Sequence, residues 1–343
     1  GEIRNAWHCP NCSALLAKSP NKNNGALRAE RAWETHYDQD LKKTIRYAKQ
    51  VPVLINYRIG KKRFEKRPDT ADLELIQKVE KSEIPYLIPT NELPMGFNTQ
   101  QPKISHGLTH THHFYTRRNL WTLASFWNKS KGSGLAQSIS WVITGIDTIS
   151  SRLLNFRVSG SGKPTPLKGT LYLSSLYPEL NPMNMFFNKY HLRIAPICRK
   201  DIFSQLIFTQ SSSSNRQTNS ESWDYIFVDP PFGGNLMYSE LNYLWESWLK
   251  VLTNNSSEAI MNEIQHKGLV EYQGIMQRCF DEFSRVLKPG RWMTVEFHNS
   301  QNSVWNAIQE ALQRARFVIA DVRVLDKQQE TFKQATTTAA VKQ

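Results

Sequence analysis

The feature that most constrains the fold is the alternation of strand-like and helix-like segments in the last third of the chain. Aromatic and β-branched residues predict strands at Trp223–Val228, Arg291–Phe297 and Phe317–Leu325. Apolar residues at helical spacing predict helices at Leu241–Leu252, Tyr272–Leu287 and Val304–Arg316. Such alternation predicts an α/β fold whose sheet is doubly wound and mostly parallel.

The tetrapeptide Asp229-Pro230-Pro231-Phe232 directly follows the strand predicted at Trp223–Val228. That position predicts a place at the carboxyl edge of the sheet, where open α/β folds bind their ligands. The prolines fix the backbone and lack N–H donors, so their carbonyls are rigid acceptors. Together with the Asp229 carboxylate and the flat Phe232 ring, they suit an exocyclic amino group on a base outside the duplex. A strand-ending turn is the alternative interpretation.

This tetrapeptide resembles the [DNS]PP[YFW] motif of amino-methyltransferases, which transfer a methyl group from S-adenosylmethionine to adenine N6 or cytosine N4. The longer blocks Val228–Leu249, Arg285–Asn299 and Val304–Asp326 resemble bacterial adenine-specific DNA methylases with a DUF1156-type N-terminal region. The resemblance covers residues 104–343. It implies a Rossmann-like methyltransferase sheet and, because the motif begins with Asp, a preference for adenine.

The resemblance also implies roles for the four residues of the motif. Asp229, Pro230 and Pro231 would hold the amino nitrogen, and Phe232 would stack on the base. Acceptors at Asp229 and at the Pro230 carbonyl would draw the N–H bonds out of conjugation, so that the nitrogen lone pair can attack the methyl group. Such catalysis depends on positioning and electrostatics and requires neither a metal ion nor a covalent nucleophile.

Four further residues are expected beside the cofactor. In the resembling family the stretch that corresponds to Phe114, Thr116 and Arg117 lies against the cofactor pocket. Glu296, at the end of the strand predicted at Arg291–Phe297, is expected to line the same pocket, and a surface role is the alternative.

A glycine-rich F-x-G-x-G loop, which holds the methionine part of the cofactor in this family, does not occur in residues 1–343. The simplest interpretation places that loop upstream, in a longer enzyme, and a permuted or decayed loop is the other. We therefore expect a catalytic region at residues 106–343 and a smaller basic accessory region at residues 1–105. The rival functions are an RNA amino-methyltransferase and a non-catalytic nucleic-acid-binding subunit of a modification or anti-phage system.

The charge balance favours a polyanionic partner. The chain has 43 Lys and Arg against 30 Asp and Glu, a net charge of +13. Residues 1–70 contain 15 basic and 7 acidic side chains, so 15 minus 7 gives +8 for this segment. We expect the segment to contact the phosphates of DNA. No run approaches the roughly eighteen apolar residues that a membrane-spanning helix needs, so no membrane partner is expected.

Cys9 and Cys12 form a CxxC that resembles half of a zinc ribbon. Structural zinc needs four ligands, and the other two cysteines stand alone in the sequence. His8 or His36 could complete the site at an irregular spacing, and a degenerate site or one completed from outside the chain are the alternatives, so zinc is a doubtful expectation. Because four cysteines are too few for a disulfide scaffold, we expect a reducing cytoplasm as the setting.

Three closely spaced histidines, His110, His112 and His113, precede the helix predicted from about Thr116. Their spacing raises the possibility of a metal site. No carboxylate or cysteine lies at ligand spacing nearby in the sequence, which favours histidines in a loop without metal.

Overall fold

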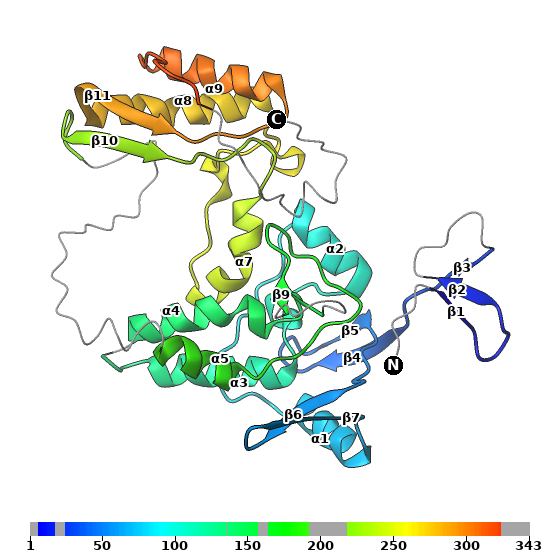
Figure 1. Cartoon of the computed structure of the whole chain (residues 1–343). Coiled ribbons are helices and arrows are strands. Elements are labelled where there is room, and N and C mark those ends of the chain that lie inside the picture. Colours follow the sequence, from blue (N-terminus) through cyan, green and yellow to red (C-terminus); the bar gives the residue numbers. More distant parts are fainter. Residues whose placement is uncertain (1–5, 18–24, 135, 157–163, 192–217, 324–343) are drawn as a thin grey trace. The chain divides into compact units, whose positions relative to one another are not determined.

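The computed structural model describes residues 6–17, 25–134, 136–156, 164–191 and 218–323 (Figure 1). The chain divides into two compact units. The first unit comprises Gly1–Leu93, Gln101–Pro166 and Tyr172–Tyr190, and the second comprises Pro94–Gln100, Leu167–Leu171 and His191–Gln343. The division runs through helix α2 (Phe97–His106). The boundary expected between residues 105 and 106 therefore falls within the first unit.

Short strands and helices make up the first unit. Its strands are β1 (Ala6–His8), β2 (Leu15–Ala17), β3 (Leu27–Arg28), β4 (Trp33–Asp38), β5 (Lys43–Ala48), β6 (Ile55–Ile59), β7 (Lys62–Lys66), β8 (Leu154–Asn155) and β9 (Thr165–Pro166). Its helices and 3-10 turns are α1 (Thr70–Glu80), η1 (Thr111–Phe114), α3 (Arg117–Ser130), α4 (Ala136–Ile146), η2 (Thr148–Ser150) and α5 (Pro182–Lys189).

Local turn chemistry explains the two longer hairpins of this unit. After β4, the Asp38 carboxylate accepts hydrogen bonds from the N–H groups of Asp40 and Leu41 at 2.9 and 3.0 Å. Such Asx turns reverse the chain, and β5 pairs antiparallel with β4. Gly60 adopts a φ of 58° between β6 and β7, where a two-residue turn requires a left-handed residue.

Helices α3, α4 and α5 pack against one another in the core of the first unit. Helix α3 begins after Thr116, whose hydroxyl accepts a hydrogen bond from the Asn119 N–H and so caps the helix. The apolar side chains of Leu123 and Ile143 are fully buried here. Burial of this apolar surface, rather than an extended sheet, holds the unit together.

The second unit contains one pair of strands and three whole α-helices in its described part. Its elements are β10 (Trp223–Val228), α7 (Tyr238–Leu249), η4 (Asn255–Ser257), η5 (Glu263–Gln265), α8 (Leu269–Val286), β11 (Leu287–Val295) and α9 (Asn302–Arg314). Strands β10 and β11 are parallel, and α8 lies beside α9 (Figure 1). Ile226 of β10 packs with Phe280 of α8 and Ile308 of α9 in one buried cluster.

The local elements predicted for the last third are largely confirmed. Helices α7, α8 and α9 lie within a few residues of their predicted ranges, and β10 has the predicted bounds. The sequence Lys288-Pro289-Gly290 predicts a sharp turn before the strand expected at Arg291–Phe297. Strand β11 already begins at Leu287, but its pairing with β10 is irregular across these residues, where Gly290 adopts a φ of 70°.

The predicted fold class, a doubly wound and mostly parallel Rossmann-like sheet, is wrong. The described residues form sheets of only two or three strands, and most strand pairs are antiparallel. The hairpins β4–β5 and β6–β7 have short connections, which allow only antiparallel pairing. Parallel pairing of described strands is limited to β10 with β11 and β2 with β3.

Two predicted strands are also wrong for identifiable reasons. The alternating sequence of Gly169–Ser174 (GTLYLS) predicts a short strand. None forms there, because the side-chain amide of Gln101 takes the place of a neighbouring strand. It accepts from the Leu173 N–H at 3.0 Å and donates to the Leu173 carbonyl at 3.1 Å. In the segment predicted at Phe317–Leu325, residues 317–323 are irregular and pair with no described strand, and the last two residues lie outside the described part.

One face of the β10–β11 pair lacks cover from the described residues of its own unit. Ile226, Met293 and Val295 contact the α8–α9 cluster. On the alternate positions, Phe227 and Trp292 are 59% and 65% exposed. Parallel sheets are usually buried on both faces, and apolar residues on both faces of β10 led to the expectation of a fully buried strand.

This one-sided packing predicts unequal effects of two aromatic truncations. Phe280→Ala should lower the free energy of unfolding by about 4 kcal/mol, because a fully buried ring is lost. Trp292→Ala should lower it by less than about 1 kcal/mol, as expected for an exposed side chain. Urea unfolding followed by circular dichroism measures both values. Equal losses in the two variants would contradict the one-sided arrangement.

Candidate functional site

The Asp229–Phe232 tetrapeptide begins where β10 ends, at the carboxyl end of the parallel pair. Val228, the last residue of β10, lies opposite Val295, the last residue of β11. The ladder extends one step further, because the Glu296 N–H donates to the Val228 carbonyl at 2.9 Å. Parallel pairing therefore brings the tetrapeptide and residues 296–299 to the same edge of the two strands.

Two hydrogen bonds fix the last two carbonyls of the tetrapeptide. The Tyr272 hydroxyl on α8 donates to the Pro231 carbonyl at 2.6 Å. Burial raises the pKa of the Tyr272 phenol, so it remains a donor. The Asn299 side-chain amide donates to the Phe232 carbonyl at 3.0 Å. The tetrapeptide is thus attached both to α8 and to the segment after β11.

The first two acceptors of the tetrapeptide remain unused within the described chain. Asp229 is exposed, and its carboxylate makes no hydrogen bond or ion pair with a described residue. Pro230 is buried, and no described residue donates to its carbonyl. Burial, followed by the charge of Asp229, raises the pKa of the nearby Tyr238. Adjacent carboxylate and carbonyl oxygens can each accept one N–H of an amino group.

Aromatic side chains support the ring of Phe232. Phe297 and His298 meet it edge to face, with ring centroids at 5.4 and 6.4 Å. Trp305 of α9 packs at right angles on Phe297 at 5.0 Å, and its indole N–H donates to the Asn299 carbonyl at 2.8 Å. These edge-to-face contacts restrict the orientation of the Phe232 ring.

The four residues expected beside the cofactor are divided between the two units. Glu296 is exposed in the second unit, directly after β11. Phe114 belongs to the first unit, where its ring is completely buried. The ring of Phe114 is therefore part of the packed core of that unit.

The other two expected cofactor neighbours, Thr116 and Arg117, are bonded within the first unit. The Thr116 hydroxyl donates to Glu179 at 2.7 Å. Arg117 forms an ion pair with Asp40, and its guanidinium also donates to the Ser82 carbonyl at 2.9 and 3.0 Å. These contacts join the start of α3 to its neighbours, so the two side chains have structural roles of their own.

Cys9 and Cys12 are free thiols near the turn between β1 and β2. Hydrogen bonds from the backbone N–H groups of Asn11 and Cys12 lower the pKa of Cys9. Within the described residues, neither cysteine belongs to a group of three or more metal-ligating side chains. That part of the chain supplies two of the four ligands that structural zinc needs.

A cluster of three other side chains does gather potential metal ligands. Asp38, His112 and His113 are all buried, and one ligand atom of each lies within 4.8 Å of the others. Both histidines use Nε2 to contact the same oxygen, Oδ2 of Asp38, at 2.9 and 2.8 Å. The carboxylate that the sequence did not place near these histidines therefore comes from the end of β4.

The hydrogen bonds favour a cluster without metal. The backbone N–H groups of Thr109 and His110 point at Nδ1 of His113, at 3.2 and 3.3 Å. Nδ1 is therefore an acceptor, and the single proton of the neutral ring lies on Nε2, which donates to Asp38. Metal binding through Nε2 would move that proton onto Nδ1, against the two N–H groups. Asp38 already accepts four hydrogen bonds, two from these imidazoles and two from the turn after β4.

Sequence analysis missed three side chains that organise these clusters. Asp38 lies 74 residues before His112, so no spacing rule could join them. Tyr272 and Trp305 were assigned only to helices, where an aromatic residue usually signals core packing. The polar atoms of the two rings were the available signal, because a buried hydroxyl or indole N–H needs an acceptor.

Comparison with protein family models, with curated proteins and with solved structures finds no match for this chain. Within the described part, no helix has both the length and the apolar character that crossing a membrane requires. The geometry above is therefore the main guide to function.

The Asp38 cluster predicts a loss of stability in mild acid. Burial lowers the pKa of His113 to about 4, whereas an unfolded histidine titrates near 6.5. Between those values the unfolded chain binds the additional proton, so stability falls as pH drops from about 6.5 to about 4. Hydrogen bonds from the imidazoles also hold the pKa of Asp38 well below its usual range, which extends the loss to lower pH.

Urea unfolding between pH 7.5 and pH 5 measures this dependence. His113 should contribute a slope of up to about 1.4 kcal/mol per pH unit, and His113→Gln should remove that part of the slope. His8→Gln, which changes an exposed histidine, is the matched control and should leave the slope unchanged. Equal slopes in wild type and His113→Gln would contradict the assignment.

Proposed function

We propose that this chain is a cytoplasmic methyltransferase that uses S-adenosylmethionine to methylate an exocyclic amino group in DNA, with adenine N6 as the target. The observation that carries the proposal is the pair of unused acceptors, the Asp229 carboxylate and the Pro230 carbonyl. They stand at the carboxyl end of a parallel strand, in a tetrapeptide whose Pro231 and Phe232 carbonyls are held by hydrogen bonds. The proposal rests on this local geometry and on the motif, not on an extended sheet.

In the proposed reaction Asp229 and Pro230 each accept one N–H of the target amino group. These hydrogen bonds localise the nitrogen lone pair, which is otherwise delocalised into the base. When bound, S-adenosylmethionine supplies the methyl group. Asp229 is the negatively charged one of the two acceptors, so its carboxylate can also accept the proton that the nitrogen loses. Pre-positioned acceptors of this kind stabilise charge that develops in the transition state.

The target base must leave the duplex to reach these acceptors. Phe232 offers a ring for stacking, and its edge-to-face contacts with Phe297 and His298 keep that ring in place. The hydrogen bonds from Tyr272 and Asn299 keep the backbone rigid beneath it. A rigid receiving site lowers the entropy cost of orienting the extruded base.

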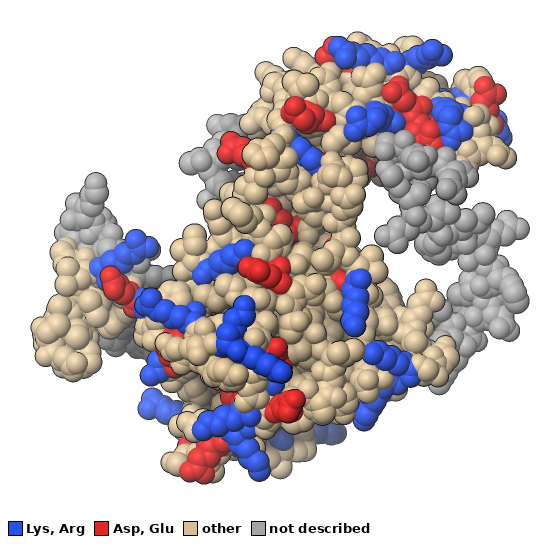
Figure 2. All heavy atoms as spheres, turned by 180° about the vertical axis from the view of Figure 1, so that it is seen from behind, with Lys and Arg blue, Asp and Glu red and all other residues tan. Residues whose placement is uncertain are grey.

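The β6–β7 hairpin of the first unit is the proposed contact with nucleic-acid phosphates. Lys61, Lys62 and Arg67 are exposed on or beside it, and Figure 2 shows many Lys and Arg side chains at the molecular surface. Tyr57 and Phe64 stack across the hairpin with ring centroids at 5.5 Å and are partly exposed. Exposed cations beside aromatic rings suit the backbone and bases of a nucleic acid.

An unfavourable charge pair adds to this argument. Arg58 and Arg63 lie directly opposite each other in the hairpin, and both are exposed. Like charges at opposed positions destabilise a strand pair. A bound phosphate would offset that repulsion, which is a physical reason for the pair to occur at a contact with a polyanion.

Labelled-methyl transfer by the full chain onto unmethylated DNA and onto RNA tests the proposed function. We expect N6-methyladenine in DNA, identified by mass spectrometry of the nucleosides. Asp229→Ala should lower the rate by about a hundredfold or more, because a transition-state acceptor is lost. Asp281→Ala, which removes an exposed carboxylate on α8, is the matched control and should retain the wild-type rate.

The remaining outcomes separate the rival functions. Label in RNA alone would favour an RNA amino-methyltransferase. No label in either nucleic acid, from a folded protein that still binds DNA, would overturn the enzyme proposal and favour a binding subunit. Unchanged transfer by Asp229→Ala would contradict the role of the motif.

The hairpin predicts a specific change in salt dependence. Replacing Arg58 and Arg63 together by Ala should weaken DNA binding for all sequences alike. The slope of log K against log salt should become shallower by up to about 1.8, since each lost phosphate contact contributes about 0.9. The control replaces Arg278 and Arg314 on α8 and α9, which removes the same charge from another surface. Fluorescence anisotropy measures both variants, and equal slopes for the two would contradict the hairpin assignment.

A further inference from the structure

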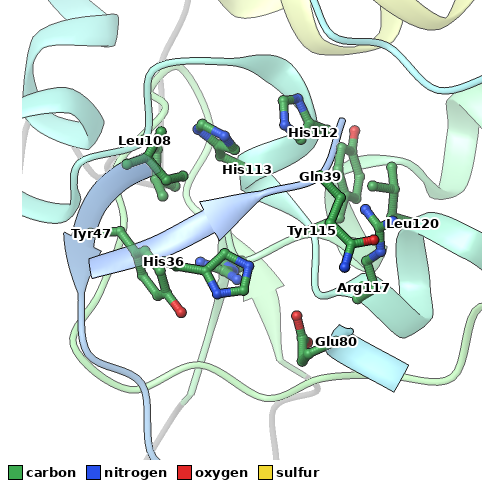
Figure 3. A pocket seen from close by; sticks show the side chains of 12 residues that line it. His36, Gln39, Tyr47, Glu80, Leu108, His112, His113, Tyr115, Arg117 and Leu120 are labelled. Carbon is green, nitrogen blue, oxygen red and sulfur yellow. The ribbon is translucent and has the colours of Figure 1, made fainter. Parts of the chain in front are cut away.

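A pocket in the first unit carries polar groups that its own residues leave unused. It has a volume of about 80 Å³ and is lined by side chains from β4, β5, η1 and the start of α3, among others (Figure 3). A cavity of about 15 Å³ holds one water molecule, so this pocket has room for several non-hydrogen atoms. The question is which chemical group would satisfy the atoms that face it.

Arg152 supplies a cation without a partner. Its side chain lines the pocket, its Nε is buried, and that atom has no hydrogen-bond partner. No described residue forms an ion pair with the guanidinium. Arg117 lines the same pocket but is bonded to Asp40 and to the Ser82 carbonyl. An arginine with unused N–H groups is suited to a carboxylate, whose two oxygens match the planar fork.

Glu80, at the end of α1, supplies the opposite charge. It is half-buried, lines the pocket and makes no hydrogen bond or ion pair with any described residue. Burial, followed by the charge and the hydrogen bond of Glu34, raises the pKa of Tyr47 to about 12, and the charges of Arg152 and Glu80 have smaller, opposite effects on it. Arg152 and Glu80 line the same pocket as Tyr47, yet they do not pair with each other.

His112 supplies a buried polar atom without a partner. The ring is 5% exposed and lines the pocket, and its Nδ1 is buried without a hydrogen-bond partner. Nε2 lies 2.9 Å from Oδ2 of Asp38, so Nδ1 is the ring nitrogen left for a ligand. A buried polar atom without a partner is costly, so a ligand with polar groups would relieve it.

We propose that this pocket binds an α-amino acid group, with the ligand carboxylate on Arg152 and the ligand ammonium on Glu80. A ligand with both charges offers a partner to each of these side chains, and the unpartnered Nδ1 of His112 lines the same pocket. A purely anionic ligand would leave Glu80 repelled, and a purely cationic ligand would repel Arg152. The group has two sources, a free amino acid or the amino-acid end of a larger molecule. The proposal is independent of methyl transfer at Asp229.

Isothermal titration calorimetry with the full chain tests the site, with L-alanine, L-methionine and S-adenosylmethionine as probes. We expect saturable binding of at least one probe. Arg152→Gln and Glu80→Gln should each weaken it by about tenfold or more, since each removes a charged hydrogen bond. The exposed controls Arg278→Gln and Glu74→Gln should change it less than twofold. Glu80→Gln loses no hydrogen bond or ion pair and keeps the size of the side chain, so the variant should fold.

The pattern of binding decides the source of the group. Binding of L-methionine or L-alanine indicates a free amino acid, whereas binding of S-adenosylmethionine alone indicates the larger molecule. Methioninol, which lacks the carboxylate, and 4-(methylthio)butanoate, which lacks the ammonium, should bind at least tenfold more weakly than L-methionine in the first case. The proposal is overturned if no probe binds, or if binding persists within twofold in both Arg152→Gln and Glu80→Gln.

Discussion

The parallel pairing of β10 with β11 is the constraint on which the proposed active site depends. Because both strands run in the same direction and end in register at Val228 and Val295, the segments that follow them leave from one edge. Tyr272 and Asn299 can then hold Pro231 and Phe232 by their carbonyls. A one-residue slip between the strands would separate these partners. The buried cluster with α8 and α9 opposes such a slip, since it uses alternate residues of both strands.

The sequence predicted local elements better than their assembly. Helical spacing and the strand-like run before Asp229 identified α7, α8, α9 and β10, since each depends on nearby residues. The extended sheet was wrong because strand pairing depends on distant partners. Leu173 shows this, since a side-chain amide of Gln101 replaces the strand that an apolar pattern suggested. Apolar residues on both faces of β10 likewise indicated burial, although Phe227 is largely exposed.

The candidate sites show the same limit of prediction from sequence, which finds contiguous residues but not distant partners. The motif at Asp229 was recognisable because its four residues are contiguous. The carboxylate of Asp38 was not, because the fold brings it to His112 across 74 residues. With the Asp38 carboxylate in place, the direction of each hydrogen bond determines whether the cluster suits a metal ion. Donors at Nδ1 of His113 favour a hydrogen-bonded cluster over a metal site, and the unpartnered Nδ1 of His112 is left for a ligand.

The most direct test of the central claim is a crystal structure of the full chain bound to DNA that contains its target site. The account predicts an extrahelical adenine whose amino nitrogen lies at about 2.6–3.2 Å from both a carboxylate oxygen of Asp229 and the carbonyl oxygen of Pro230. The Phe232 ring should stack on the base. An extrahelical base bound elsewhere, or a base whose amino group contacts neither acceptor, would contradict the account.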